Sequence, residues 1–278
     1  MTRKTKARFI TFVEKLLASG RIAFSRADAE KELGLPRLSV LKSARLLEKQ
    51  GKLYSPRNGY YVAVPPQFSF WGSPPPSWFI DDLMRFEGLA YYVGLLKAAE
   101  LHGAAHQAVM EFQVITSGRL PKLRAGRSIV CFYFRREIEE VAGGTERRNT
   151  EAGTMRISSP ELTALDLVRY VHATGGLDQV LTVLIELGAK IDGGKLAILC
   201  PKFEAAVRQR LGYLLSRGGH AHAAEVIHAS LSNDPTFRWV ELDPSTKAQA
   251  DPDLCIEPIK RDSRWRLIVR REPEADQQ

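Results

Sequence analysis

Apolar residues in the first 64 positions recur at helical spacing, and turn residues divide them into short segments. A first amphipathic helix is predicted over residues 7–18, where five apolar side chains share one face: Phe9, Phe12, Val13, Leu16 and Leu17. Ser19 and Gly20 end this helix, and residues 21–24 are typical of a short strand. The pattern thus predicts a helix and a strand before the next helical segment.

Two further helices are predicted, with a tight turn between them. Ser25 precedes a helix over residues 26–33 as its N-cap, and Gly34 ends that helix. Pro36 suits the first position of the next helix, over residues 36–50, which ends at Gly51. Two short helices joined by a turn that contains glycine form a helix-turn-helix.

A β-hairpin is predicted directly after the third helix. Residues 52–55 and 60–64 have strand-like composition, and the segment between them contains Asn58-Gly59, the strongest short hairpin signal. A hairpin in this position is the wing of a winged helix-turn-helix.

The third helix divides into an apolar face and a basic face. At 100° per residue, Val40, Ala44 and Leu47 lie on one side. Lys42, Arg45 and Lys49 lie on the opposite side. A recognition helix in the major groove of DNA needs this division, with one face packed on the protein and one face free.

The predicted DNA-binding residues come from three places. Arg37 and Ser39 stand at the start of the third helix, where base edges are reached. Arg57 and Asn58 stand at the tip of the wing, and the basic residues before the first helix suit a phosphate-binding arm. The full set consists of Arg3, Lys4, Lys6, Arg37, Ser39, Lys42, Arg45, Lys49, Arg57 and Asn58, with Arg8 as a further arm residue.

The charge distribution supports a polyanion as the partner of this region. The whole chain carries a net charge of +8. Residues 1–64 hold 14 Lys and Arg against 5 Asp and Glu, a net of +9, so the other 214 residues sum to −1. Nucleic acid is the leading polyanion, an anionic membrane surface is the weaker competitor, and a solvated basic face that mediates protein contacts is the third interpretation.

The remainder of the chain predicts a connector and a second, larger domain. Residues 65–82 are rich in proline and in aromatic residues, which we expect either to dock on a domain or to form a patch for a partner. Residues 83–278 mix predicted helices and strands without βαβ repetition. The predicted fold class is therefore α+β, with an N-terminal winged helix-turn-helix over residues 1–64 followed by a larger mixed α/β C-terminal domain over residues 83–278.

Individual elements of the larger part follow from the same patterns. Helices are predicted over residues 88–101, from 160 onward, and over 177–187, 203–215 and 221–231. Strands are predicted over residues 112–116, 129–135, 155–158, 237–242 and 265–269, and a polar, mobile loop over 143–149.

Five short blocks in the larger part resemble a known family. Residues 91–103 read YYVGLLKAAELHG and residues 112–116 read FQVIT. Residues 159–167 read SPELTALDL, and residues 210–215 and 240–244 read RLGYLL and VELDP. These blocks resemble, in the same order, the AbiEi family of antitoxins from type IV, abortive-infection toxin–antitoxin systems. Leu162 departs from the family pattern, which often has Arg at this place.

The resemblance implies a function for each part of the chain. It implies that the N-terminal domain binds inverted repeats in double-stranded DNA of its own promoter and represses the operon. It further implies that the C-terminal domain confers antitoxicity and contributes to cooperative DNA binding, which allows self-association on DNA. The cognate toxin would be nucleotidyltransferase-like, and the antitoxin would act without a stable complex with it.

Enzymatic alternatives find little support in the sequence. His102 and His106 are four residues apart, the spacing of two metal ligands on one helix face, but Gly103 stands where a zincin has glutamate. His220 and His222 are two residues apart and would point in different directions on a helix. We expect no catalytic residues, no metal and no cofactor. Three separated cysteines and no apolar membrane span predict a cytoplasmic protein. Two alternatives stay open, a ligand-responsive winged-helix regulator and a nucleic-acid-modifying enzyme that the winged helix targets.

Overall fold

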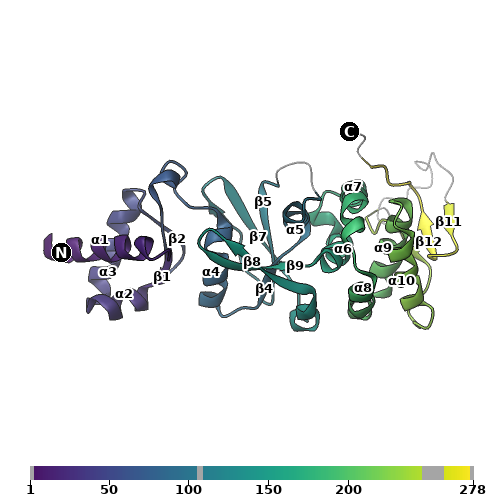
Figure 1. The fold of residues 1–278 in the computed structure, drawn as a ribbon, viewed down its shortest axis with the longest axis horizontal. Coiled ribbons are helices and arrows are strands. Elements are labelled where there is room, and N and C mark those ends of the chain that lie inside the picture. The colour runs from purple at the N-terminus through teal and green to yellow at the C-terminus, as the bar shows by residue number, and fades with distance from the viewer. Residues whose placement is uncertain (1–2, 105–108, 246–259, 276–278) are drawn as a thin grey trace. The chain divides into compact units, whose positions relative to one another are not determined.

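The computed structural model describes residues 3–104, 109–245 and 260–275. These residues pack into two compact units, each made of discontinuous segments. Unit 1 comprises residues 1–93, 110–138 and 147–157, and unit 2 comprises residues 94–109, 139–146 and 158–278. The sequence places the division at the connector over residues 65–82, whereas the packing keeps the N-terminal helices in one unit with a sheet. The fold is mixed α+β, as predicted (Figure 1).

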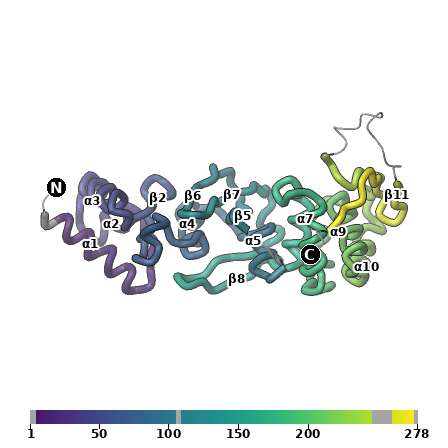
Figure 2. Tube along the Cα trace, turned by 90° about the horizontal axis from the view of Figure 1, so that it is seen from above, coloured from purple at the N-terminus to yellow at the C-terminus, as the bar shows by residue number. Residues whose placement is uncertain are grey.

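The N-terminal module occupies residues 3–64 of unit 1 and consists of three helices and a three-stranded sheet. Its elements are, in chain order, α1 (Arg3–Ala18), β1 (Ala23–Ser25), α2 (Arg26–Leu33), α3 (Arg37–Lys49), β2 (Leu53–Arg57) and β3 (Tyr60–Ala63). The strand order is β1-β3-β2, and both pairings are antiparallel. This is the order of elements expected for a winged helix-turn-helix, and Figures 1 and 2 show the three helices grouped beside the hairpin.

Local chemistry fixes the ends of α2 as the sequence predicts. The Ser25 hydroxyl accepts a hydrogen bond from Asp28 N, and the Asp28 carboxylate accepts one from Ser25 N, which completes a capping box. Gly34 has φ 58°, a left-handed conformation in which a Cβ is costly, and its N–H bonds the carbonyl of Glu30. Pro36 caps α3 rather than entering it as its first residue.

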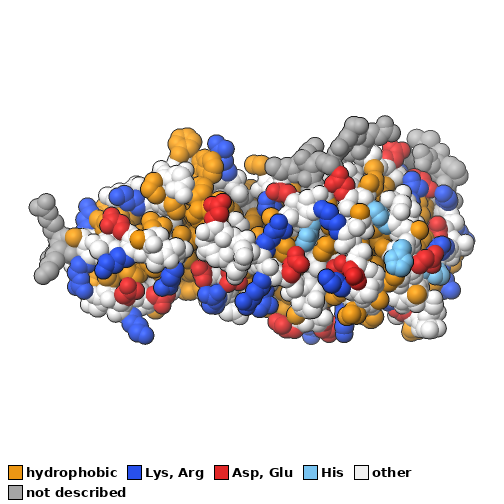
Figure 3. Space-filling model, in the orientation of Figure 1, with side chains coloured by type: hydrophobic (Ala, Val, Ile, Leu, Met, Phe, Trp, Pro, Cys, Tyr) orange, Lys and Arg blue, Asp and Glu red, His pale blue; other side chains and the backbone are white. Residues whose placement is uncertain are grey.

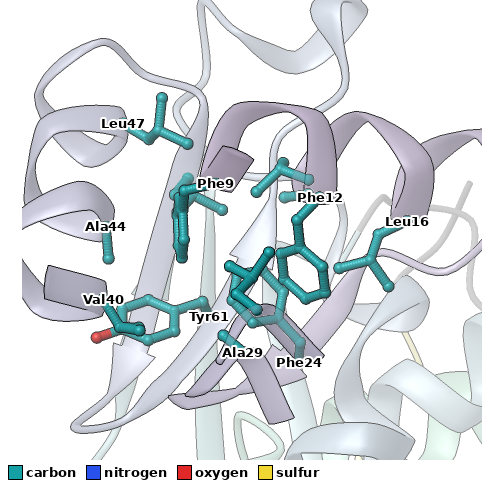
Figure 4. Close-up of a cluster of buried hydrophobic side chains, with 13 residues drawn as sticks. Phe9, Phe12, Leu16, Phe24, Ala29, Val40, Ala44, Leu47 and Tyr61 are labelled. Atoms are coloured by element: carbon teal, nitrogen blue, oxygen red, sulfur yellow. The ribbon is translucent and has the colours of Figure 1, made fainter. Parts of the chain in front are cut away.

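A single apolar cluster holds the three helices on the small sheet. Phe9 and Phe12 from α1 pack against Phe24 from β1, with ring centroids 6.2 and 5.1 Å from that of Phe24. The cluster continues into α2, α3 and β3 through the side chains labelled in Figure 4, Ala29, Val40, Ala44, Leu47 and Tyr61, all of them buried. Burial of these faces determines which side of α3 is left for solvent.

Unit 1 also contains a six-stranded mixed sheet with the order β6-β7-β5-β4-β9-β8. Its strands are β4 (Tyr91–Val93), β5 (Glu111–Thr116), β6 (Leu123–Ala125), β7 (Ser128–Phe134), β8 (Thr145–Thr150) and β9 (Gly153–Ser158). Strands β5 and β7 pair in parallel over six residues each, from Glu111↔Ile129 to Thr116↔Phe134. The strands expected near residues 112–116, 129–135 and 155–158 are confirmed.

Two expectations for this region are wrong. The helix predicted over residues 88–101 is interrupted, because Gly88 (φ 68°) ends the preceding helix α4 (Ile80–Glu87) and the next apolar run forms β4. Only its last part is helical, as α5 (Leu95–Leu101). The polar loop predicted over residues 143–149 is instead the end of a 3-10 segment (Ile138–Gly144) and strand β8, since edge strands tolerate polar side chains.

Unit 2 is mainly helical. Besides α5 it contains α6 (Pro160–Arg169), α7 (Leu177–Leu187), α8 (Gly193–Leu199), α9 (Ala205–Arg217) and α10 (Ala221–Leu231), with short 3-10 turns over Val171–Ala173, Gly188–Lys190 and Cys200–Lys202. Three short strands, β10 (Val240–Glu241), β11 (Lys260–Asp262) and β12 (Leu267–Val269), form a small sheet. The helices predicted at 177–187 and 221–231 are confirmed at both ends.

One glycine and one glutamine attach the small sheet to α9. Gln209 donates from Nε2 to the carbonyls of Arg238 and Trp265, at 2.9 and 2.8 Å. The buried Trp265 ring lies so close to Gly212 that a Cβ there would stand 2.1 Å from Cζ3. The helical part of unit 2 and its C-terminal strands therefore share one core. Across the described residues, no helix is both long and apolar enough to cross a membrane.

Candidate nucleic-acid interface

Helix α3 presents one exposed stripe opposite a buried face. Val40, Ala44 and Leu47 are at most 2% exposed and pack into the core of the N-terminal module. Lys42, Arg45 and Lys49 are exposed, as the helical spacing predicts. Figure 3 shows Lys and Arg side chains distributed over this module. The stripe has the form of a cationic helix face that a duplex groove can accept.

The start of α3 adds one residue that is absent from the predicted DNA-binding set. Arg37 is exposed and Ser39 is half-buried, so both lie at the accessible end of the helix. Leu38 continues the stripe of Lys42, Arg45 and Lys49 and is 69% exposed. Contact between an exposed leucine side chain and water is unfavourable. Such a side chain within a basic stripe suits contact with an apolar group, such as a thymine methyl group in the major groove. The helical spacing of position 38 relative to 42, 45 and 49 is the signal that identifies it.

The hairpin tip differs in its surroundings from a free wing. Arg57 donates from Nε to Glu87 Oε1 at 3.0 Å and from one terminal nitrogen to the carbonyl of Pro121 at 2.8 Å. Its guanidinium also lies 5.7 Å from the centre of the Phe132 ring. Only 18% of the Arg57 side chain is exposed, so its charge is neutralised within unit 1. Asn58 is exposed.

A second contact holds the hairpin on the larger sheet. The Tyr54 hydroxyl on β2 donates to the carbonyl of Arg124 on β6 at 2.6 Å. Burial raises the pKa of Tyr54 to about 12, so the hydroxyl keeps its proton and remains the donor at neutral pH. Together with the Arg57 contacts, this bond fixes the hairpin to the sheet. The Arg57 guanidinium is thus engaged within unit 1, and Asn58 is the exposed predicted residue at the hairpin tip.

The basic residues at the N-terminus lie on α1 rather than on a separate arm. The helix begins at Arg3, four residues earlier than predicted. The side chains of Arg3 and Lys4 lie outside the described part, and Lys6 is partly exposed. Arg8 donates to the carbonyl of Leu33 at 2.6 Å and so ties α1 to the end of α2. Lys6 stays a predicted phosphate contact, whereas Arg8 has a role within the fold.

The histidines that a metal site would need are engaged elsewhere. His102 Nε2 lies 2.7 Å from the carbonyl of Ser158, and His220 Nε2 lies 2.8 Å from the carbonyl of Ile185. His106 falls outside the described residues. Within the described ranges, no group of three or more His, Cys, Asp and Glu side chains is placed to hold a metal ion.

Comparison with solved structures shows a similar fold over nearly the whole chain. The crystal structure of the RV2827C protein from Mycobacterium tuberculosis is similar to this chain with a TM-score of 0.66, over 97% of this chain and 92% of that one. The two sequences are 15% identical, so the likeness establishes the fold alone. No curated protein matches the chain.

The fold and the basic helix face define a class of protein in which a small basic helical module is joined to a larger α+β body. Within that class, residues 92–217 match the family model of the AbiEi antitoxin C-terminal domain, which supports an AbiEi family antitoxin. The family resemblance in the sequence is thereby confirmed. The match supports an antitoxin role in a toxin–antitoxin system, with a toxin as the functional partner.

Proposed function

We propose that this antitoxin is also a DNA-binding autorepressor, whose N-terminal module is a winged helix-turn-helix. The observation that carries the proposal is the exposed stripe of Lys42, Arg45 and Lys49 on a helix whose other face is fully buried. The net charge of +9 over residues 1–64 supplies the long-range attraction to phosphate. The DNA would be inverted repeats in the promoter of its own operon.

The contacts divide by role along α3. Lys42, Arg45 and Lys49 neutralise phosphates or reach groove edges, and Arg37 with Ser39 lies where base edges are read. Asn58 and Lys6 contribute peripheral contacts. Arg57 instead acts within the protein, because its guanidinium is already paired with Glu87.

The regulatory and antitoxic roles would reside in different parts of the chain. The family match covers residues 92–217, whereas the basic stripe lies on residues 38–49. We propose that the toxin is a nucleotidyltransferase-like protein, countered without a stable complex, and that the chain itself is not an enzyme. A variant that loses DNA binding through α3 should accordingly still protect cells that express the toxin.

The test is the double variant K42A/R45A, measured on a fluorescent duplex of the promoter repeats. Removing two phosphate contacts should lower the magnitude of the salt slope, d log K/d log [salt], by about 1.8 and should abolish binding at physiological salt. Circular dichroism should show an unchanged fold, because both side chains are exposed. Unchanged affinity and slope would overturn the proposal.

A matched control separates helix-specific contact from bulk charge. Lys15 on α1 and Lys31 on α2 are exposed, and K15A/K31A removes the same charge from the same module. This control should retain most of the affinity. If K15A/K31A and K42A/R45A weaken binding equally, α3 is not the recognition helix.

A further inference from the structure

A second basic surface lies on unit 1, outside the N-terminal module. Residues 112–136 contain six Arg and Lys and no Asp or Glu. The charge summed over residues 65–278 conceals this segment, because acidic residues elsewhere cancel it. Four of the six side chains are exposed around strand β6: Arg119, Lys122, Arg124 and Arg127. None of the four forms an ion pair with a carboxylate of the described residues.

Aromatic rings order two of these arginines. The Arg127 guanidinium lies 4.8 Å from the centre of the Trp71 ring, and Arg119 lies 4.9 Å from the centre of Phe134. A ring beneath a guanidinium restrains it without neutralising its charge, so its N–H groups stay available to an anion. This arrangement differs from that of Arg57, whose charge Glu87 neutralises.

The connector supplies a projecting apolar group beside these arginines. Phe68 packs on Trp71 and on Trp78, with ring centroids 5.6 and 5.0 Å apart, which stiffens the segment. Phe70 takes no part in this stack and is 91% exposed. Figure 3 shows hydrophobic side chains gathered on a projection at the upper edge of the view, above β2 in Figure 1. The connector thus holds one phenylalanine out into solvent on a rigid base.

The projection touches the β6–β7 turn. A Cβ on Gly126 would stand 3.1 Å from the carbonyl oxygen of Trp71 and 3.3 Å from that of Ser73. Gly126 also has φ 58°, so both conformation and space require glycine there. The connector and the arginine-bearing turn are therefore in direct contact.

The same surface adjoins the end of α3. Lys49 is the last residue of the exposed stripe and of α3. Gly51 follows two residues later, and a Cβ placed on it would stand 3.8 Å from the carbonyl oxygen of Ser69. Tyr54, just beyond, bonds the carbonyl of Arg124. The connector residues Ser69 and Phe70 therefore lie between the end of the exposed stripe on α3 and the arginines of β6 and its turn.

We propose that this connector–β6 surface (Phe70, Arg119, Lys122, Arg124 and Arg127) is a second DNA contact, which binds duplex flanking the site read by α3. Charge decides the occupant, because four exposed cations that form no ion pair within the described residues repel a second copy of the same surface and attract phosphate. The arginines neutralise backbone phosphates. Phe70 makes an apolar contact to the duplex, as wedge side chains of minor-groove proteins do. The inference rests on the proposed function, since it extends the same DNA site.

The experiment compares full-length R124A/R127A with wild type on two duplexes, one that covers only the promoter repeat and one extended by flanking DNA. Wild type should bind the longer duplex more tightly and with a steeper salt slope. R124A/R127A should lose that gain, with a slope on the longer duplex smaller by about 1.8. F70A should weaken binding to the longer duplex several-fold and leave the slope unchanged, since no charge is removed.

Matched controls lie on the opposite edge of the same sheet. Arg147 on β8 and Arg156 on β9 are exposed. The variant R147A/R156A removes the same amount of charge as R124A/R127A, from the two strands that lie farthest from β6 in the sheet. This variant should behave as wild type. Equal losses for the two double variants would indicate bulk attraction and overturn the assignment to the connector–β6 surface.

The outcomes distinguish this inference from the proposed function. If wild type binds and K42A/R45A does not, while R124A/R127A and F70A match wild type on both duplexes, the second contact is refuted and the autorepressor stands. If wild type binds no duplex, the proposed function itself fails. If F70A instead weakens self-association in sedimentation while DNA binding is unchanged, the projection is a protein contact and the inference is wrong.

Discussion

Arg57 and Glu87 form an ion pair, with Arg57 Nε 3.0 Å from Glu87 Oε1, that joins the β2–β3 hairpin to the end of α4. The two side chains are 18% and 21% exposed, and the Pro121 carbonyl accepts a further bond from Arg57. The hairpin tip thus serves to hold the N-terminal module on the larger sheet of unit 1, which keeps α3 in a fixed relation to that sheet.

Replacing Arg57 by Ala should destabilise unit 1 by about 2 kcal/mol, because it leaves Glu87 without its partner in a largely desolvated place. Urea unfolding should report the loss, and E87A added to R57A should cost little more. The exposed K31A serves as the control and should stay within about 0.5 kcal/mol of wild type. Equal stability of R57A and wild type would mean that the ion pair does not hold the hairpin.

Replacing Leu38 by Ala should change DNA discrimination rather than stability. Leu38 is 69% exposed, so truncation removes almost no packing. If its side chain meets a thymine methyl group, L38A should reduce the preference for that base pair by about tenfold, equivalent to about 1.4 kcal/mol, with an unchanged salt slope. Binding measured over a set of single-base operator variants checks this. A uniform loss across all variants would contradict a base-specific role.

The sequence determines the N-terminal module well because its signals are local. Helical spacing predicts which face of α3 is buried, Ser25 and Gly34 mark the ends of α2, and Asn58-Gly59 predicts the hairpin. The partners of the hairpin tip could not be predicted from local signals, since Glu87 and Pro121 are 30 and 64 residues away from Arg57 in the sequence.

The larger part is less predictable for two physical reasons. The apolar run at Tyr91–Val93 fits a helix or a buried strand equally well, and pairing with β5 and β9 decides for the strand. Unit 1 is also assembled from three separate stretches of chain, so no composition shift marks its bounds. The second basic surface could have been found by counting charges in shorter windows, because residues 112–136 contain no acid.

Replacing Gly212 by Ala should destabilise unit 2 by about 3 kcal/mol, since its Cβ would overlap the buried Trp265 ring at 2.1 Å from Cζ3. G143A is the matched control, because a Cβ on Gly143 meets nothing within 4 Å. Thermal unfolding should separate the two variants by several degrees. Antitoxicity should fall with G212A and not with G143A. A G212A protein as stable as wild type would show that the ring can move aside at little cost.

Replacing Asp82 by Asn should leave unit 1 at least as stable as wild type at neutral pH. Burial raises the pKa of Asp82, and Asp81 adds to the shift, while Arg85 and Arg21 oppose it without cancelling it. A carboxyl whose pKa is raised on folding disfavours the native state when ionised, and this penalty is lost as the pH falls through the folded pKa. Wild type should therefore gain stability relative to D82N as the pH falls from neutral to about 4, as measured by urea unfolding at each pH.

The ion pair of Arg85 with Asp81 remains in the variant, so any change in stability reports Asp82 itself. A D82N protein that is less stable at neutral pH, with a difference that shrinks toward low pH, would show that the pairing with Arg85 outweighs burial.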